Sequence, residues 1–266
     1  MQSITLDRRH QAQTLARRSD QRRRRLALLS HCQNGSSFRS ATRLGVGKGW
    51  RCLEVGGGDG SFAEWLSARV GPSGIVVVVE ADVRLSEWLT DPNVYVRQMD
   101  LASDALPLDE CDFVHIGWAL TETSERERVL ARQRAALRPG GLLMIEEWDA
   151  FSVLATATGA YRDGWQAFLS AQQAGGIDHE RARELPARLT ELGLVAVDAT
   201  LDVPLFRGGS TEAELWSLTL EQARERVAGL GDTGTAIDGA RAELTDEQRW
   251  FHGPATVTAW GRRAQD

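Results

Sequence analysis

Short hydrophobic runs alternate with amphipathic segments through the middle of the chain. The run at 75–79 is apolar at every position, as expected of a parallel strand that is covered on both faces. Similar runs predict further strands, and the segments between them predict helices. The predicted strands are residues 51–55, 75–79, 94–98, 113–117 and 142–146, and the predicted helices are 61–70, 84–89 and 124–137. Strands that alternate with helices in this way indicate a parallel, doubly wound α/β sheet.

The flanking segments have a different pattern. Residues 7–30 contain few helix breakers and predict a helix, and the Asn-Gly-Ser-Ser stretch at 34–37 predicts a turn before a short helix that ends near 45–47. Past residue 148 the expected helices are 150–190, 210–228 and 231–250, and the expected strands are 194–203 and 255–260. Ser210 is expected to cap the helix that it precedes.

The charge of the chain bears on its partners. The net charge of −6 over 266 residues argues against a nucleic-acid partner, because surfaces that bind nucleic acids are basic. Residues 1–30 nevertheless hold eight arginines and two acids. Such a segment occurs in RNA-binding and membrane-binding proteins, and also on solvated helices that pack against an acidic body. We favour the packed helix, because no aromatic residue lies among the arginines to stack on bases.

Cysteine and histidine usage narrows the setting. Three cysteines are an odd number and fit no closed disulfide framework, so a reduced, cytoplasmic environment is expected. No signal peptide and no apolar stretch of membrane-spanning length is visible, so no membrane association is expected. The five histidines show no metal-ligand spacing, which predicts that the protein uses no metal.

A glycine-rich segment joins the first predicted strand to the helix after it. It reads Glu54-Val55-Gly56-Gly57-Gly58-Asp59-Gly60. Glycines let the backbone turn sharply and let a ligand approach, and the helix that follows presents free N–H groups. A dinucleotide-binding loop would have a third glycine at position 61, where this chain has Ser61. The segment predicts either a ligand-binding loop or only a tight turn.

Acidic residues follow the next two predicted strands. Glu80 ends the second strand, where a carboxylate can accept hydrogen bonds from a ribose diol, and Asp82 is an alternative for that role. Asp100 ends the third strand, where it can accept from the exocyclic amine of an adenine. Open parallel sheets bind ligands at the carboxyl ends of their strands, so the glycine loop and these acids together predict a nucleotide-like ligand.

With this loop and these acids, residues 45–150 resemble the class I S-adenosylmethionine-dependent methyltransferases. The resemblance implies a Rossmann-like, doubly wound and mostly parallel seven-stranded sheet, with an antiparallel C-terminal strand pair and a helical cap. It implies that the loop wraps the methionine part of the cofactor, that Glu80 holds the ribose, and that Asp100 meets the adenine with Leu101 beside it. His115 or Ile116 would lie near the sulfonium. The predicted cofactor-binding residues are Glu54, Gly56, Gly58, Asp59, Gly60, Ser61, Glu80, Ala81, Asp100, Leu101 and His115.

Within that family the chain resembles methyltransferases that act on small, natural-product-like molecules. It lacks the N/D-P-P-Y/F motif after the fourth strand that marks amino-methylating nucleic-acid enzymes. Relatives often carry a basic residue and a histidine where this chain has Gly117 and Glu122. The expected product is S-adenosylhomocysteine, and the expected partner is a small-molecule acceptor.

Residues on the acceptor side are less clearly marked. His115 is the first candidate for a catalytic base, although it could equally pack against the cofactor. His179 and His252 have no motif around them and are expected to be structural. Aromatic residues can line an acceptor pocket or simply fill a core. The candidate pocket residues are Trp118, Glu122, Glu147, Trp148, Tyr161 and Trp165.

The predicted division of the chain is a helical cap at 1–44, a cofactor-binding core at 45–150, a helical lid or substrate insertion at 151–190, and the rest of the core sheet at 191–266. The predicted function is methyl transfer to a small molecule by a monomer or homodimer. The main alternative is a cyclase or rearrangement enzyme that binds the cofactor without transferring the methyl group. A non-enzymatic scaffold and a nicotinamide oxidoreductase are less well supported.

Overall fold

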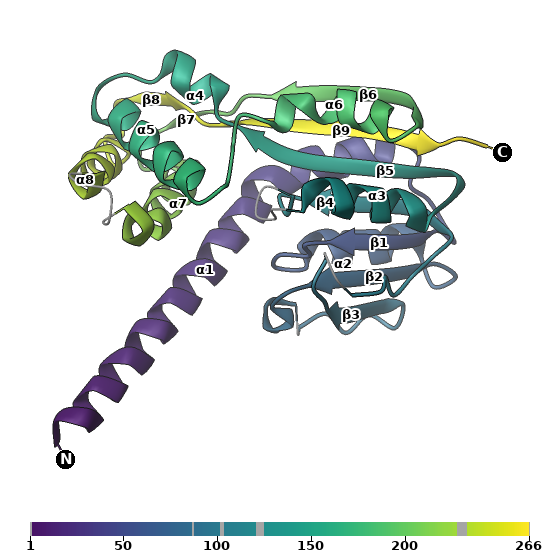
Figure 1. The fold of residues 1–266 in the computed structure, drawn as a ribbon, viewed down its shortest axis with the longest axis horizontal. Helices are drawn as coiled ribbons and strands as arrows, with labels where there is room; N and C mark the ends of the chain where they lie inside the picture. The colour runs from purple at the N-terminus through teal and green to yellow at the C-terminus, as the bar shows by residue number, and fades with distance from the viewer. Residues whose placement is uncertain (1, 87, 102–103, 121–124, 228–232, 266) are drawn as a thin grey trace.

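The computed structural model of the protein describes residues 2–86, 88–101, 104–120, 125–227 and 233–265 (Figure 1). Its centre is a seven-stranded sheet with the order β3-β2-β1-β4-β5-β9-β6. The strands are β1 Arg51–Val55, β2 Ile75–Glu80, β3 Val94–Gln98, β4 Cys111–Gly117, β5 Leu137–Asp149, β6 Leu194–Asp202 and β9 Ala255–Arg263. The first five strands pair in parallel, and β9 runs antiparallel to both β5 and β6. The predicted fold class, with its antiparallel strands from the C-terminal part of the chain, is confirmed.

The sheet is covered on both faces, which is why its central strands are so apolar. Val76, Val78 and Val79 of β2 are fully buried. On one face, helix α2 (Ser61–Val70) packs with the end of α1 (Gln2–Arg43). On the other face lie α3 (Arg126–Ala136) and α6 (Leu185–Glu191). The side chains that cover the second face include Val129, Leu130, Leu185 and Leu189.

Helix α1 is continuous through residues 34–37, so the turn predicted there is wrong. Its polar residues are used in contacts with the rest of the protein. Asn34 donates to the Ser61 hydroxyl at 2.7 Å, and Ser36 donates to Asp202 at 3.0 Å. Phe38, one turn further on, stacks on Trp65 of α2. In Figure 1 the N-terminal part of α1 projects away from the body.

A helical layer lies beyond the carboxyl end of β5. It consists of α4 (Phe151–Thr156), α5 (Gly159–Ala174), α7 (Thr211–Val227) and α8 (Thr233–Glu243), with a small sheet of β7 (Leu205–Arg207) and β8 (Trp250–His252). Its hydrophobic core is separate from that of the sheet and includes Leu28 and Leu29 of α1. Helix α7 begins after Ser210, whose hydroxyl accepts from the Ala213 amide at 3.2 Å, as the predicted cap requires.

Some predicted boundaries differ from the structure. The helix predicted at 84–89 is only a 3₁₀ turn, Val83–Leu85, because Trp88 leaves the helical path and donates to the Asp59 carbonyl at 2.7 Å. Strand β5 begins at Leu137, which pairs with Cys111 before an irregularity in the register. The helix predicted at 231–250 is α8, and its last residues instead lead into β8.

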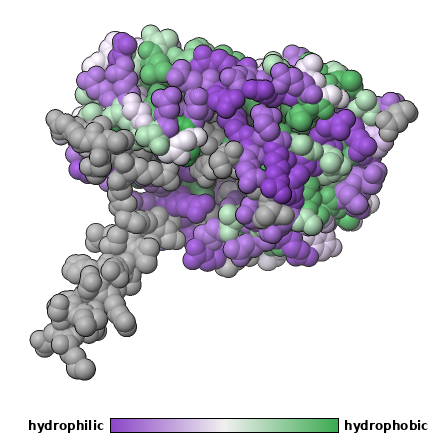
Figure 2. Space-filling view, in the orientation of Figure 1, coloured by the Kyte–Doolittle hydropathy of each residue, from purple (hydrophilic) through white to green (hydrophobic). Residues whose placement is uncertain are grey.

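Hydrophobic residues occupy only a minor part of the surface on the side of the protein that Figure 2 shows. The face in Figure 2 is mainly hydrophilic, with smaller hydrophobic areas between. None of the helices in the described parts of the chain is long and apolar enough to cross a membrane. All three cysteines are free.

Candidate active site

The glycine loop between β1 and α2 forms one wall of a cavity of about 880 Å³. Gly56 and Gly58 have φ angles of 74° and 54°, a region that side chains disfavour. A Cβ atom on Gly56 would lie 2.7 Å from the Cβ of Ala119, whereas one on Gly58 would meet only the Gly56 carbonyl at 4.0 Å. Gly56 therefore allows close packing against the loop after β4, and Gly58 leaves its side of the loop open.

The loop is fastened to α1 by two of its own polar residues. The Asp59 carboxylate accepts from the Ser61 amide at 3.1 Å and from the Ser30 hydroxyl at 2.7 Å. Ser61 in turn accepts from Asn34. Both Asp59 and Ser61 line the cavity. Helix α1 thus holds the start of α2 beside the cavity.

Glu80 lies at the end of β2 and is 9% exposed. Its carboxylate accepts from the amides of Gly58, Ala81 and Asp82 at 3.2, 2.9 and 3.3 Å. A carboxylate has about four acceptor positions, so one remains for a ligand. Glu80 thus both holds the glycine loop and faces the cavity, and Ala81 lines the cavity beside it.

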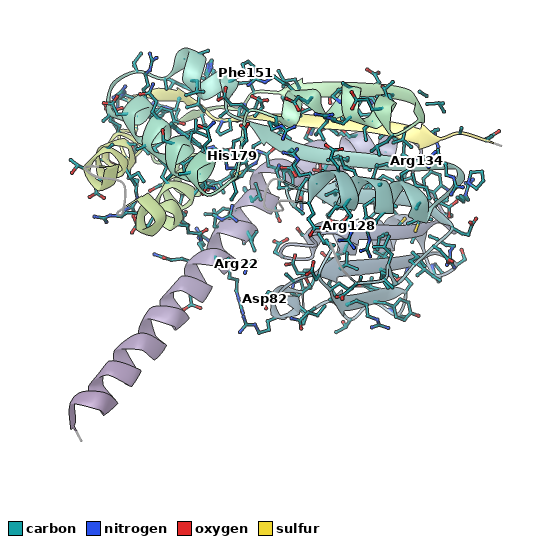
Figure 3. The ribbon with its side chains drawn as sticks, in the orientation of Figure 1. Arg22, Asp82, Arg128, Arg134, Phe151 and His179 are labelled. Atoms are coloured by element: carbon teal, nitrogen blue, oxygen red, sulfur yellow. The ribbon has the colours of Figure 1, made fainter. Side chains whose placement is uncertain are left out.

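Asp82, the alternative to Glu80, is committed elsewhere. It forms two hydrogen bonds of 2.7 Å with the Arg84 guanidinium, which lower the pKa of Asp82. Arg22 of α1 also reaches toward it, at 4.0 Å (Figure 3). Asp82 does not line the cavity, so the structure favours Glu80.

The residues after β3 reach the same cavity. Asp100 and Leu101 both line it, next to Met99. The Asp100 amide donates to the Asp104 carboxylate at 2.8 Å, which holds the backbone here. The carboxyl ends of β1, β2, β3 and β4 therefore meet at one cavity, as expected from the topology of such sheets.

His115 of β4 is buried between two carboxylates. Its Nδ1 lies 2.8 Å from Glu54 Oε2, and its Nε2 lies 3.1 Å from Glu146 Oε2. Burial lowers the pKa of His115, but the two carboxylates outweigh this effect and raise the pKa to about 10. The ring is then an imidazolium that donates from both nitrogens and has no lone pair for a proton. This geometry speaks against His115 as a base and makes it the residue that holds Glu54 at the cavity.

This buried imidazolium makes stability depend on pH. The pKa of His115 rises from its ordinary value of 6.5 to about 10 on folding, so the native state binds the proton more tightly. Its contribution is complete below pH 6.5 and is lost as the pH rises toward 10. We expect the free energy of unfolding in urea to fall more steeply over this range for the wild type than for His115→Gln. Equal slopes in the two proteins would contradict this assignment.

Five of the six predicted pocket residues can be placed beside the cavity or away from it. Trp118 and Trp148 line the cavity, and so does Glu147, which accepts from the Leu120 amide at 2.6 Å. Tyr161 and Trp165 do not line it: they are 2% and 1% exposed and fill the core of the helical layer. Both of these α5 side chains point into that core and not into the cavity. Glu122 lies outside the described residues.

Several residues without a sequence signal form the far side of the cavity. Leu26 and Leu29 come from α1, Gln172 from α5, and Thr219 and Gln222 from α7. Phe168 of α5, one of the aromatic residues expected either to line a pocket or to fill a core, lines the cavity as well. His179, which was expected to be structural, also lines the cavity, between the helical layer and the end of the sheet (Figure 3). No local motif marks these residues, because only the tertiary fold brings them together.

Comparison with known proteins decides the family. Residues 8–199 match the model of a family described as a methyltransferase domain. The chain belongs to this family. The predicted membership of the class I S-adenosylmethionine-dependent methyltransferases is thereby confirmed.

Individual relatives agree with the family. The chain is 31% identical over 124 residues to the ubiquinone/menaquinone biosynthesis C-methyltransferase UbiE of Bordetella avium, covering 40% of this chain and 44% of that protein. It thus spans half or less of the length of the curated relatives that it matches. Among solved structures, the YcgJ protein of Bacillus subtilis has a TM-score of 0.57 at 14% identity, over 89% of this chain and all of that one. A chain of the complex between the Haloferax volcanii Trm112 activator and a methyltransferase has the same TM-score at 14% identity, over 91% and 94%. These structures share the fold.

The residues of this methyltransferase-fold cavity fit S-adenosylmethionine. The open side of Gly58 allows close approach of a ligand, and Glu80 keeps acceptor capacity for a hydroxyl. The cavity volume lies at the upper end of the range for a single ligand site, which leaves room for an acceptor as well. Among the described residues, no group of three or more His, Cys, Asp or Glu side chains is suited to hold a metal ion.

Proposed function

We propose that this protein transfers the methyl group of S-adenosylmethionine to a small organic acceptor. The observation that carries the proposal is the continuity of the cavity. Its lining runs from the glycine loop and Glu80 to Trp148 of β5 and Phe168 of α5. One cavity therefore joins the cofactor-binding edge of the sheet to an aromatic surface of the helical layer.

The residues of the chain supply alignment and a dry environment. Bound here, S-adenosylmethionine provides a methyl group on a sulfonium centre. Glu80 and Glu54 hold its polar parts, while Leu26, Leu29 and Phe168 exclude water from the acceptor side. Alignment of two reactants in this way contributes about 7–11 kcal/mol to lowering a barrier. In this proposal α1 forms the cap, and residues 151–190 form part of the lid. The protein acts in the cytoplasm as a monomer or homodimer, and it has no nucleic-acid or membrane partner.

The test is an incubation of the purified protein with S-adenosylmethionine and reduced benzoquinones or naphthoquinones. The curated relatives are named for quinone biosynthesis, so these acceptors are tried first. We expect S-adenosylhomocysteine and a product that is heavier by one methylene unit. A rearranged product of unchanged mass would favour the cyclase alternative. Failure of the protein to bind S-adenosylmethionine in calorimetry would overturn the proposal.

A further inference from the structure

Several N–H donors on the far side of the cavity are buried without a partner. Trp118 Nε1, Trp148 Nε1, His179 Nδ1 and Gln222 Nε2 are inaccessible to solvent and have no hydrogen-bond partner among the described residues. All four residues line the cavity. An unpaired buried donor costs about 1–3 kcal/mol, so native proteins keep few of them. Trp165 and Trp216 also carry buried, unpaired indole N–H groups, but these two residues lie outside the cavity lining. The four donors around the cavity are the ones for which a ligand can supply acceptors.

The protonation state of His179 makes its Nδ1 a donor. The Gln172 amide nitrogen lies 3.3 Å from His179 Nε2, and because an amide nitrogen only donates, Nε2 accepts. Burial lowers the pKa of His179 to about 4, so the ring is neutral and carries its hydrogen on Nδ1. This side chain is nine-tenths buried, and Phe168 stacks on its ring at 5.5 Å.

The acceptor groups nearby do not serve these donors. The Glu147 carboxylate accepts from the Leu120 amide, which holds the loop after β4. The remaining lining on this side includes the apolar Leu26, Leu29 and Ile177. The side chains thus present N–H donors between flat aromatic and aliphatic surfaces.

We infer that this side of the cavity binds a flat acceptor molecule whose ring carries conjugated carbonyl or ionised hydroxyl oxygens, to which His179, Gln222 and the two indoles donate. The inference rests on the proposed function and specifies its substrate class. Donors stabilise an enolate or phenolate, so the acceptor binds in ionised form with its proton already lost to bulk solvent. The electron pair of its nucleophilic atom then forms the bond to the methyl carbon, while the pair of the breaking C–S bond stays on sulfur. Such an acceptor needs no base in the site, which agrees with an imidazolium at His115.

The test measures binding of two probes by calorimetry in the presence of S-adenosylhomocysteine. One probe is 2-hydroxy-1,4-naphthoquinone, and the other is naphthalene, which has the same ring system without oxygens. We expect the wild type to bind the quinone at least about tenfold more tightly than naphthalene. His179→Phe keeps a flat, buried ring and removes the N–H, so it should weaken quinone binding about tenfold and leave naphthalene binding unchanged.

The control is Trp165→Phe, which removes an indole N–H that is also buried and unpartnered but lies outside the cavity lining. It should leave binding of both probes unchanged. If His179→Phe does not fold, Gln222→Leu provides the same comparison. Equal binding of the two probes by the wild type, no binding of the quinone, or an unchanged affinity in the His179 and Gln222 variants would overturn the inference. Binding of S-adenosylhomocysteine is measured separately, so its loss in the wild type would count against the proposed function and not against the donor-lined site.

Discussion

Replacement of Glu80 by alanine is expected to weaken the binding of S-adenosylhomocysteine at least about 100-fold. The acceptor position that Glu80 keeps for a ribose hydroxyl contributes about 1.5–3 kcal/mol, and this hydrogen bond would be lost. The variant also removes the acceptor for the Gly58 amide, which positions the glycine loop. The affinity is measured by calorimetry, with circular dichroism as the check that the variant is folded.

Asp82→Ala is the matched control, because it removes a carboxylate two residues away. Asp82 pairs with Arg84 on the surface, and exposed ion pairs of this kind contribute about 0–1 kcal/mol to stability. We expect the affinity of this variant to remain within about threefold of the wild type. A large loss with Asp82→Ala and none with Glu80→Ala would assign the ribose to Asp82 instead.

Replacement of His115 by leucine is expected to destabilise the fold by about 3–5 kcal/mol, because it removes the shared partner of two buried carboxylates. Glu54 and Glu146 are each no more than 2% exposed, and among the described residues Glu146 would keep only the Thr258 hydroxyl at 3.0 Å as a side-chain partner. At about 2–4 °C per kcal/mol for a chain near this size, the melting temperature should fall by roughly 6–20 °C. Thermal unfolding at pH 7, followed by circular dichroism, measures this change.

His31→Leu makes the same substitution at an exposed position of α1 and should change stability by no more than about 0.5 kcal/mol. If the His115→Leu variant has the same melting temperature as the His31→Leu control, the two carboxylates do not depend on the imidazole.

The sequence predicted the parts of the protein that local patterns determine. Buried parallel strands must be apolar, so the run at 75–79 located β2 within one residue. The glycine loop and Glu80 could be found because cofactor binding at a strand end needs a particular backbone and a carboxylate at a fixed place in the topology. The cap that Ser210 provides for α7 was also predictable, because a serine hydroxyl before a helix accepts from a backbone amide of its first turn.

The rest depended on contacts between distant segments. Asn34 is a residue type that often occurs in turns. In the folded protein its side-chain amide donates to Ser61, and α1 stays helical at this position. Neither Trp148 nor Trp165 has a motif that marks a pocket residue, but Trp148 lines the cavity and Trp165 does not. His179 has no neighbouring motif, and the cavity that it lines is formed by α1, the carboxyl ends of β1 to β5, α5 and α7, which only the fold brings together.

Helix α1 touches both ends of the cavity. Ser30 and Asn34 hold the glycine loop, while Leu26 and Leu29 form part of the acceptor wall. The two binding reactions are therefore linked through one rigid element. A cofactor that fixes the position of α1 also fixes the acceptor wall, and by thermodynamic reciprocity the acceptor strengthens cofactor binding by the same factor.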